Sequence, residues 1–375
     1  MKMSYKKYLF LAFVIPLPFL LAYIILLYVY DPLQIYHKPY FRETTFFNDM
    51  RMQDKGIIAY YDFDSFIMGS SMLMGSSSKE ATEKLGNKWI NIALNGSRFN
   101  QRAVILDYLF KHKKPKSIIY TLDGIMLLST LEQDTKAFDY LYDENPFNDF
   151  KTYINARFLK CALTFSKAKE CVGEYTDIHT LNSIKNSPTM KLYGGFENWI
   201  KYRDDPRIKE IVDALGSIDT LPPFQPIQQA FDIQPIIEHL NTHFVRFIKE
   251  NPKTQFHIIL PTYSRLSYRL SPPQNFYAWA QIISYFIPYC EQFSNVKFYG
   301  FDHLDYADNI ANYNDLYHYY YDLNSFHLDA IAQNAFILNS QNIVPYLRFM
   351  EQKIMQYDAK PLIDMIKSYK NQQLP

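Results

Sequence analysis

Asp64-Ser65-Phe66-Ile67-Met68-Gly69-Ser70-Ser71 is a short apolar run that breaks at a glycine followed by two serines. A run of this length between turn residues predicts a buried strand that ends in a sharp turn. Open α/β sheets bind their ligands in the crevice outside the carboxyl ends of their strands. The sequence therefore predicts that this turn presents a serine hydroxyl at the ligand-binding edge of a sheet.

The segments around this run alternate between strand and helix patterns. Strands are predicted at Phe63–Met68, Trp89–Ala93, Lys116–Tyr120, Gln255–Leu260 and Val296–Tyr299. Helices are predicted at Ser78–Leu85, Asn100–Lys111, Ile233–Glu250, Pro273–Glu291 and about Asn324–Leu338. Strands separated by helical segments indicate βαβ units. The predicted fold class is therefore α/β, built on a parallel sheet.

The chain divides into four parts. Residues 1–30 are expected to form a cytoplasmic stub and a transmembrane anchor, and residues 31–55 a polar neck that contains aromatic side chains. The α/β domain occupies residues 56–340, and a C-terminal helix and tail follow at 341–375. Within the domain, residues about 128–230 lose the strand–helix rhythm and show no strand pattern. We expect them to form a helical insertion over the crevice.

The N-terminal segment Tyr8–Tyr30 has 23 residues and no formal charge. That length exceeds the roughly 20 apolar residues that cross a bilayer. Lys2, Lys6 and Lys7 precede it, so the positive-inside rule keeps the N-terminus in the cytoplasm. A cleaved signal peptide is the alternative, but its cleavage site needs small residues, whereas residues 27–31 are bulky. We therefore expect a single-pass protein of the inner (cytoplasmic) membrane, with its C-terminal domain outside the cytoplasm.

Composition limits the classes of ligand. The formal net charge of the 375 residues is +1, which provides no basic face for nucleic acid. The three cysteines lack C-x-x-C spacing, although Cys161 and Cys171 can form a disulfide in an oxidising compartment. His239 and His243 lie four apart on a predicted helix, but they lack the glutamate of an H-E-x-x-H zinc motif, and no third ligand is evident. We interpret this pair as a solvated helix face and expect no metal or other cofactor.

A second motif, Asp315-Leu316-Tyr317-His318, lies near the C-terminal end of the domain. An aspartate and a histidine three residues apart can face the same way, so that the carboxylate orients the imidazole and the imidazole deprotonates a serine. We assign Ser71 as the nucleophile, His318 as the base and Asp315 as the residue that orients the base. Ser70 is the alternative nucleophile.

Two other Asp/His pairs compete with this assignment. Asp322 and His327 are five residues apart and would diverge on a helix, where Asn324-Ser325 fits better as the cap. The second pair, Asp302-His303, directly follows a predicted strand.

Acyl transfer also needs hydrogen-bond donors for the developing oxyanion. The candidates are the backbone N–H groups of Ser71 and Gly96, because a glycine lets a substrate approach the backbone closely. Gly96 lies at the end of the second predicted strand, in Asn91-Ile92-Ala93-Leu94-Asn95-Gly96-Ser97.

These blocks resemble the SGNH/GDSL hydrolase superfamily over roughly residues 56–340. Residues 66–71 look like its Gly-x-Ser turn, whose last serine is the nucleophile. Residues 91–97 are similar to the second block, whose glycine supplies an oxyanion N–H, and residues 313–318 match the Asp-x-x-His block. The resemblance implies a flavodoxin-like three-layer α/β/α fold and ester or acyl-transfer chemistry without a metal.

Within that superfamily, the chain looks like the membrane-anchored branch that includes alginate O-acetylation proteins and the D-alanyl-transfer proteins of teichoic acids. This implies an extracytoplasmic serine esterase or O-acyltransferase, with acetyl as the favoured group, that acts on a cell-envelope polysaccharide. The implied partners are that polysaccharide or an acyl donor, and a polytopic membrane protein that exports the acyl group.

The third block departs from the superfamily pattern. An asparagine usually donates to the oxyanion there, whereas this chain has Thr121-Leu122-Asp123-Gly124. An ionised aspartate only accepts hydrogen bonds. Three alternatives remain open: Asp123 points elsewhere, Asn95 or Asn91 takes its place, or the site is weak or inactive. An inactive site would leave a glycan-binding or scaffold protein of the envelope.

Overall fold

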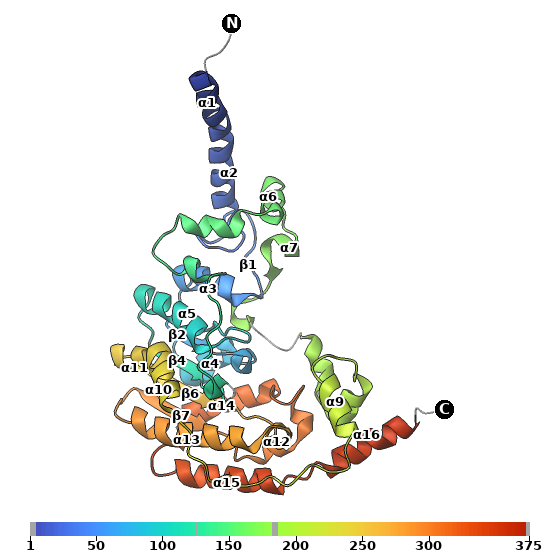
Figure 1. Ribbon diagram of the computed structural model, residues 1–375. Coiled ribbons are helices and arrows are strands. Elements are labelled where there is room, and N and C mark those ends of the chain that lie inside the picture. Colours follow the sequence, from blue (N-terminus) through green and yellow to red (C-terminus); the bar gives the residue numbers. More distant parts are fainter. Residues whose placement is uncertain (1–4, 125, 182–186, 373–375) are drawn as a thin grey trace.

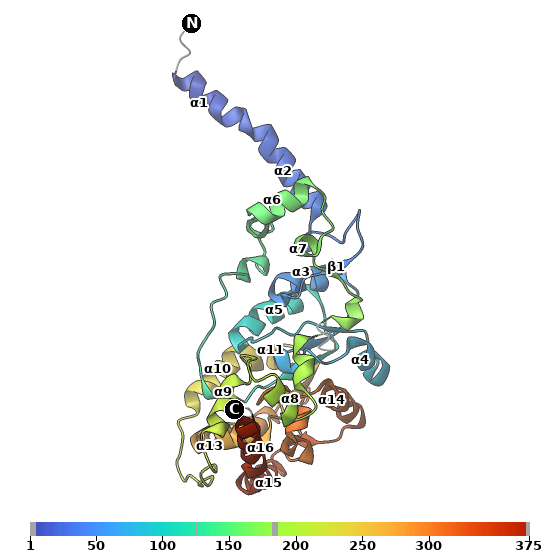
Figure 2. The same cartoon turned by 90° about the vertical axis from the view of Figure 1, so that its right-hand side faces the viewer.

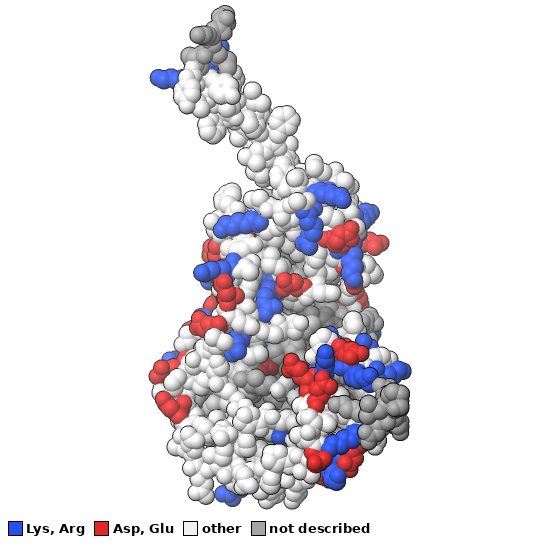
Figure 3. Space-filling view, turned by 45° about the vertical axis from the view of Figure 1, so that its right-hand side comes forward, with Lys and Arg blue, Asp and Glu red and all other residues white. Residues whose placement is uncertain are grey.

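A computed structural model of the protein describes residues 5–124, 126–181 and 187–372. A long N-terminal helix, made of α1 (Tyr5–Val14) and α2 (Pro16–Tyr30), projects away from the body of the molecule (Figure 1). It has 26 residues and a mean hydropathy of 2.7, so it is long and apolar enough to span a membrane. Charged side chains gather on the body and leave this helix almost bare (Figure 3).

The body is built on a sheet of six described strands in the order β3-β2-β4-β6-β7-β8. These are β2 (Ser65–Met68), β3 (Trp89–Asn91), β4 (Ser117–Thr121), β6 (Gln255–Leu260), β7 (Val296–Gly300) and β8 (Ile337–Leu338). The first five are parallel, and β8 runs antiparallel to β7. Because β3 lies on one side of β2 and all later strands lie on the other, the strand order reverses between β2 and β4.

Helices cover both faces of the sheet, because alternate strand residues point to opposite sides. Phe66 and Ile118 point into a large core that is closed by α5 (Phe99–His112), α10 (Gln234–Leu240), α11 (Arg246–Glu250) and α13 (Pro273–Cys290). Ile67 and Ile119 point into a second core, closed by α4 (Ser78–Leu85) and α14 (Tyr321–Gln333). Figure 2 shows α4 and α14 on one side of the body and α10 and α13 on the other. The prediction of a mostly parallel α/β sheet is confirmed.

The first half of the insertion lies beside the neck, not over the sheet. Helices α6 (Ala156–Leu163) and α7 (Lys169–Val172) are linked by a disulfide between Cys161 and Cys171. Strand β5 (Glu174–Tyr175) pairs antiparallel with β1 (Thr45–Phe46) of the neck. The expectation that the insertion contains no strand is therefore wrong, because β5 depends on a partner far away in sequence.

The second half of the insertion packs elsewhere. Helices α8 (Phe196–Lys201) and α9 (Lys209–Gly216) contribute to a third core together with α16 (Lys360–Gln372), and Figure 1 shows α9 beside α16. The remaining α-helices within the described residues are α3 (Met50–Tyr60), α12 (Arg265–Leu270) and α15 (Ile343–Gln356). The insertion thus joins two separate regions of the molecule.

Two predicted helices differ from the structure. The helix expected over residues 233–250 is interrupted between α10 and α11 by a π-helical turn, Asn241–Val245. Helix α14 ends at Gln333, earlier than expected, because Asn334 takes a left-handed conformation with φ of 51°. The expected cap residue Asn324 lies inside α14, and its side-chain amide donates to the carbonyl of Met72 instead.

Candidate active site

The serine turn and the Asp-x-x-His segment meet at the carboxyl end of β2. The Ser71 hydroxyl lies 2.8 Å from Nε2 of His318, and Nδ1 of His318 lies 2.6 Å from Oδ2 of Asp315. Ser71 is partly exposed, and the His318 and Asp315 side chains keep 33% and 12% of their surface exposed. With Nδ1–H donated to Asp315, Nε2 accepts the serine proton. The three side chains therefore have the geometry of a Ser-His-Asp triad.

The sharp turn after β2 depends on Gly69. A Cβ at this position would lie 2.4 Å from Oγ1 of Thr121 on β4, so no larger residue fits without displacing the Thr121 side chain. The Ser70 N–H donates to the same Oγ1, and a 3₁₀ turn over Ser71–Leu73 follows at once. Ser71 therefore begins the first turn beyond β2. Ligands of open α/β sheets bind at the point where the strand order reverses, which here lies between β2 and β4.

Asp315 also shapes the loop that carries the histidine. Its Oδ1 accepts the backbone N–H groups of Tyr317 and His318 at 2.7 and 2.8 Å. The Tyr319 hydroxyl donates to the Met72 carbonyl at 2.9 Å, which ties the histidine loop to the serine turn. The imidazole is thus held by its own loop and by the segment that carries Ser71.

The titration of the two partners follows from their contact. Burial acts to raise the pKa of Asp315, but the hydrogen bond and charge of His318 outweigh it, and the pKa is lowered. Burial acts to lower the pKa of His318, but the hydrogen bond and charge of Asp315 outweigh it and raise the pKa above the usual 6.5. This pairing favours the imidazolium that forms when the base takes the serine proton.

Ser70 belongs to a different, buried cluster. It is 3% exposed, and its hydroxyl donates to Oδ1 of Asp123 at 2.5 Å. Oδ2 of Asp123 accepts from Arg102 at 2.6 Å and from the Thr121 hydroxyl at 3.2 Å. Arg102 is itself fully buried and also donates to the side chain and carbonyl of Ser97. The Ser70 hydroxyl therefore donates its hydrogen bond to the Asp123 carboxylate, whose charge is paired with that of Arg102.

The contacts of Asp123 bear on the question that the sequence left open. Both oxygens of Asp123 accept hydrogen bonds inside the cluster, so its carboxylate offers no donor to an oxyanion. Of the alternatives left open by the sequence, the structure corresponds to the one in which Asp123 points elsewhere.

The turn that contains Gly96 lies next to the serine turn. The Leu94 N–H donates to the Gly69 carbonyl at 2.8 Å, and Gly96 is exposed with φ of 60°, a conformation that favours glycine. Within the described part of the chain, the backbone N–H groups of Ser71 and Gly96 make no hydrogen bond. Both remain available to a ligand.

The two asparagines of this block have different surroundings. The Asn91 side-chain amide donates to the carbonyls of Leu73 and Ser76 at 2.8 and 2.9 Å, so it stabilises the segment that follows Ser71. Asn95 is exposed, and its carbonyl accepts from Arg51. Asn95 is thus the asparagine of this pair that a ligand can reach.

Neither competing Asp/His pair forms a hydrogen-bonded pair. His327 is buried, and burial lowers its pKa to about 3. Asp322 instead accepts the Tyr306 hydroxyl at 2.7 Å. Burial raises the pKa of Asp302 to about 7, although the positive charge of Arg265 acts to lower it. The Arg265 guanidinium donates a hydrogen bond to the Asp302 carbonyl. These residues support the fold around the site.

Sequence reasoning missed Arg102, although a signal was present. Arg102 lies on the apolar face of α5, in phase with Phe99, Leu106 and Leu109. An arginine on a buried helix face needs a carboxylate partner, because an unpaired buried charge is costly. Asp123, which closely follows the buried strand β4, could have been predicted as the carboxylate partner of Arg102.

A small aromatic cavity of about 110 Å³ borders the site. Tyr317, which precedes His318, and Gly124, which follows Asp123, both line it. Further lining side chains are Tyr263, Tyr268 and Trp279.

No protein-family model matches this chain, and no curated protein matches it at a significant level. The interpretation of the site therefore depends on its geometry and chemistry.

Proposed function

We propose that the protein is a membrane-anchored, extracytoplasmic serine esterase or O-acyltransferase of the cell envelope. The observation that carries this proposal is the hydrogen-bonded chain from Ser71 through His318 to Asp315 at the carboxyl end of β2. A partly exposed serine held by a carboxylate-bound histidine is suited to nucleophilic attack on an ester carbonyl.

The reaction has two steps. Ser71 attacks the acyl carbon while His318 takes its proton, and the alcohol leaves with a proton returned by His318. Water or a sugar hydroxyl, deprotonated by the same imidazole, then attacks the acyl-serine and releases the acid or a new ester. The N–H groups of Ser71 and Gly96 are the proposed donors to the oxyanion.

The strand order supports the SGNH/GDSL resemblance. Numbered along the chain, the five parallel strands lie in the order 2-1-3-4-5, which is the flavodoxin-like order. Helices on both faces of the sheet agree with a three-layer α/β/α architecture. We therefore propose membership of that superfamily, with the Asp123 cluster as a departure from its usual third block.

The location outside the cytoplasm has two independent supports. Lysines at positions 2, 6 and 7 precede the apolar helix, which favours a cytoplasmic N-terminus and an anchor in the inner membrane. The Cys161–Cys171 disulfide fits an oxidising compartment, since cytosolic thiols are kept reduced.

The substrate proposal is an O-acylated polysaccharide of the envelope, with acetyl as the acyl group. The 110 Å³ cavity beside Tyr317 suits a small acyl group and an aromatic contact with a sugar. If the enzyme is a transferase, the proposed partner is a polytopic membrane protein that delivers the acyl donor, because the described residues contain a single helix that could span a membrane and one helix provides no channel.

The test is hydrolysis of p-nitrophenyl acetate and of an O-acetylated envelope polysaccharide by the full-length protein in detergent. We expect release of p-nitrophenol and acetate, lost in Ser71→Ala and retained in Ser70→Ala. Full activity of folded Ser71→Ala would overturn the proposal, and so would a wild-type protein that cleaves neither ester and transfers no acetyl group from a soluble donor.

A second candidate is a non-catalytic glycan-binding or scaffold protein, which Asp123 at the usual asparagine position favours. Glycan binding that is unchanged in Ser71→Ala and His318→Ala, together with no turnover of any ester, would support this candidate over the first.

A further inference from the structure

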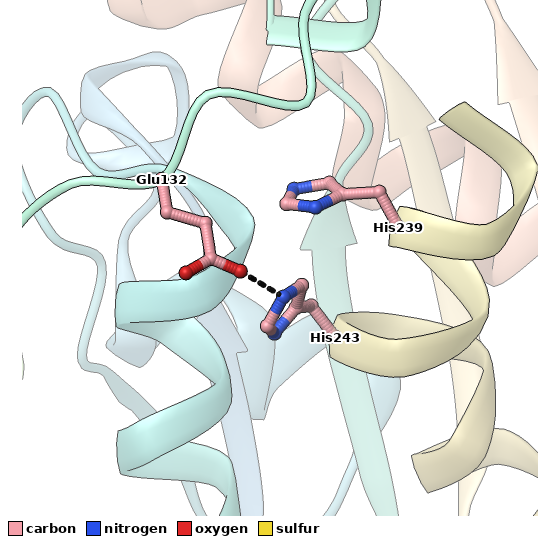
Figure 4. A group of neighbouring side chains, drawn as sticks. All are labelled: Glu132, His239 and His243. Atoms are coloured by element: carbon pink, nitrogen blue, oxygen red, sulfur yellow. Dashed lines mark hydrogen bonds and ion pairs between the residues drawn. The ribbon is translucent and has the colours of Figure 1, made fainter. Parts of the chain in front are cut away.

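A group of three side chains away from the triad brings together two imidazoles and a carboxylate. Glu132, His239 and His243 point toward one another, Glu132 from a loop and the histidines from the α10–α11 segment (Figure 4). Oε1 of Glu132 lies 2.8 Å from Nε2 of His243, and one donor atom of each residue lies within 4.8 Å of the others. The third ligand that the sequence did not reveal is therefore Glu132.

We propose that Glu132, His239 and His243 form a binding site for a divalent transition-metal ion of the zinc class, with one position open to water. Two imidazole nitrogens and one carboxylate oxygen are a ligand set that zinc accepts, whereas magnesium and calcium prefer oxygen ligands.

The spacing of the donor atoms fits such an ion. Metal–ligand distances of about 2.1 Å place neighbouring ligands of a tetrahedral site about 3.4 Å apart. That separation lies between the 2.8 Å contact of Glu132 with His243 and the 4.8 Å limit of the group. The three donor atoms therefore lie close enough together for one ion to be their common partner.

The helical segment that carries the two histidines changes from α-helical to π-helical between them. The π-helical turn Asn241–Val245 begins between His239 and His243 and includes the second. A π-helix has more residues per turn than an α-helix, so residues four apart come closer to being aligned along the axis. The two rings accordingly lie with their centroids 4.6 Å apart. Such turns often occur at functional sites, and this is an observation separate from the identity of the three residues.

The loop that carries Glu132 is held in place by hydrogen bonds to the backbone of the next residue, Gln133. The Gln133 carbonyl accepts from the Asn100 side chain at 2.7 Å, and the Gln133 N–H donates to the same side chain at 3.3 Å. The Asp134 carbonyl accepts from Gln101. Although Glu132 itself is 58% exposed, its backbone is therefore held against α5.

A histidine binds a metal ion through an unprotonated ring nitrogen that has no other hydrogen-bond partner. Within the described residues, the His239 ring makes no hydrogen bond, so a ring nitrogen can bind an ion.

The bound ion would fasten the loop at residues 129–135 to the α10–α11 segment. His239 also contacts Phe99, whose ring lies under the Arg102 guanidinium at 5.3 Å from the centroid. The proposed metal site thus adjoins the buried Arg102–Asp123 cluster, but it does not depend on the chemistry assigned to Ser71.

The test uses the full-length protein in detergent, with an affinity tag that contains no histidine, after removal of metals by chelation. Titration with Co²⁺ is followed by its visible d–d absorption, and Zn²⁺ is then added as competitor. The variants are Glu132→Gln, His239→Ala and His243→Ala. The matched control is His112→Ala, which replaces an exposed histidine whose ring packs at a tilt against Tyr108. Circular dichroism checks the folding of each.

We expect one Co²⁺ per chain, displacement by Zn²⁺, and affinity lowered roughly tenfold or more in each of the three variants but unchanged in the control. Zn²⁺ should also raise the unfolding temperature of the wild type and not that of His239→Ala. Absence of saturable binding of either ion to the wild type would overturn the proposal. Metal affinity equal to that of the wild type in folded His239→Ala and His243→Ala would overturn it as well.

Discussion

Ser70 and Ser71 are adjacent residues of the same type, yet they occupy two different environments. Ser70 is buried, caps the 3₁₀ turn by accepting the Met72 N–H, and donates to Asp123. Ser71 is partly exposed and contacts His318. The comparison shows that the backbone turn at the end of β2 separates a buried hydroxyl bound to a carboxylate from a partly exposed one that contacts a histidine. A hydroxyl is activated by a base that can take its proton, and Asp123 is already neutralised by Arg102.

Ser71→Ala should give the largest effect. Removing the nucleophile of a triad lowers kcat by a factor on the order of 10⁶, as in a serine protease. The folded state should be unaffected within about 1 kcal/mol, because this side chain is not part of the core. Ester hydrolysis measures kcat, and thermal unfolding measures the stability of the folded state. If Ser71→Ala keeps more than a tenth of wild-type activity, the proposed difference in role between Ser70 and Ser71 is wrong.

Asp315→Asn should lower kcat by a factor on the order of 10⁴, since an amide cannot hold His318 in the required tautomer. The pH at half-maximal kcat/KM should move as well. Asp315 raises the His318 pKa above 6.5, and the base must be neutral, so wild-type activity should rise with pH through a midpoint above 6.5. In Asp315→Asn the midpoint should shift to lower pH, and an unshifted profile would argue against His318 as the base.

Asp123→Ala should mainly affect stability. It leaves the fully buried Arg102 without its carboxylate, which costs about 3–5 kcal/mol in the free energy of unfolding. The matched control is Asp62→Ala, because the Asp62–Lys88 ion pair is exposed and screened by solvent, so its loss should change the free energy of unfolding very little. Equal losses for the two variants in denaturant unfolding would show that the cluster around Ser70 does not support the fold.

Ser70→Ala should have the smallest effect. It removes one turn cap and one hydrogen bond to Asp123, worth about 1–2 kcal/mol of stability. Activity should stay within about tenfold of the wild type, because Ser71 and His318 retain their contact. A loss of activity as large as that of Ser71→Ala would make Ser70 the nucleophile.

The sequence predicted what short, contiguous patterns encode. The strand that ends just before Gly69 and the Asp315–His318 segment each form one local unit, and the order of βαβ units brings their ends to one edge of the sheet. Arg102 and Glu132 were missed because their partners come from distant segments. The two-residue strand β5 was missed because it exists only through pairing with β1.

The most direct test of the central claim is to label the full-length protein with a fluorophosphonate and map the modified residue by peptide mass spectrometry. The account predicts a single adduct on Ser71, reduced to background in His318→Ala and retained in Ser70→Ala. An adduct on Ser70, or equal labelling of Ser71 in folded His318→Ala, would contradict it.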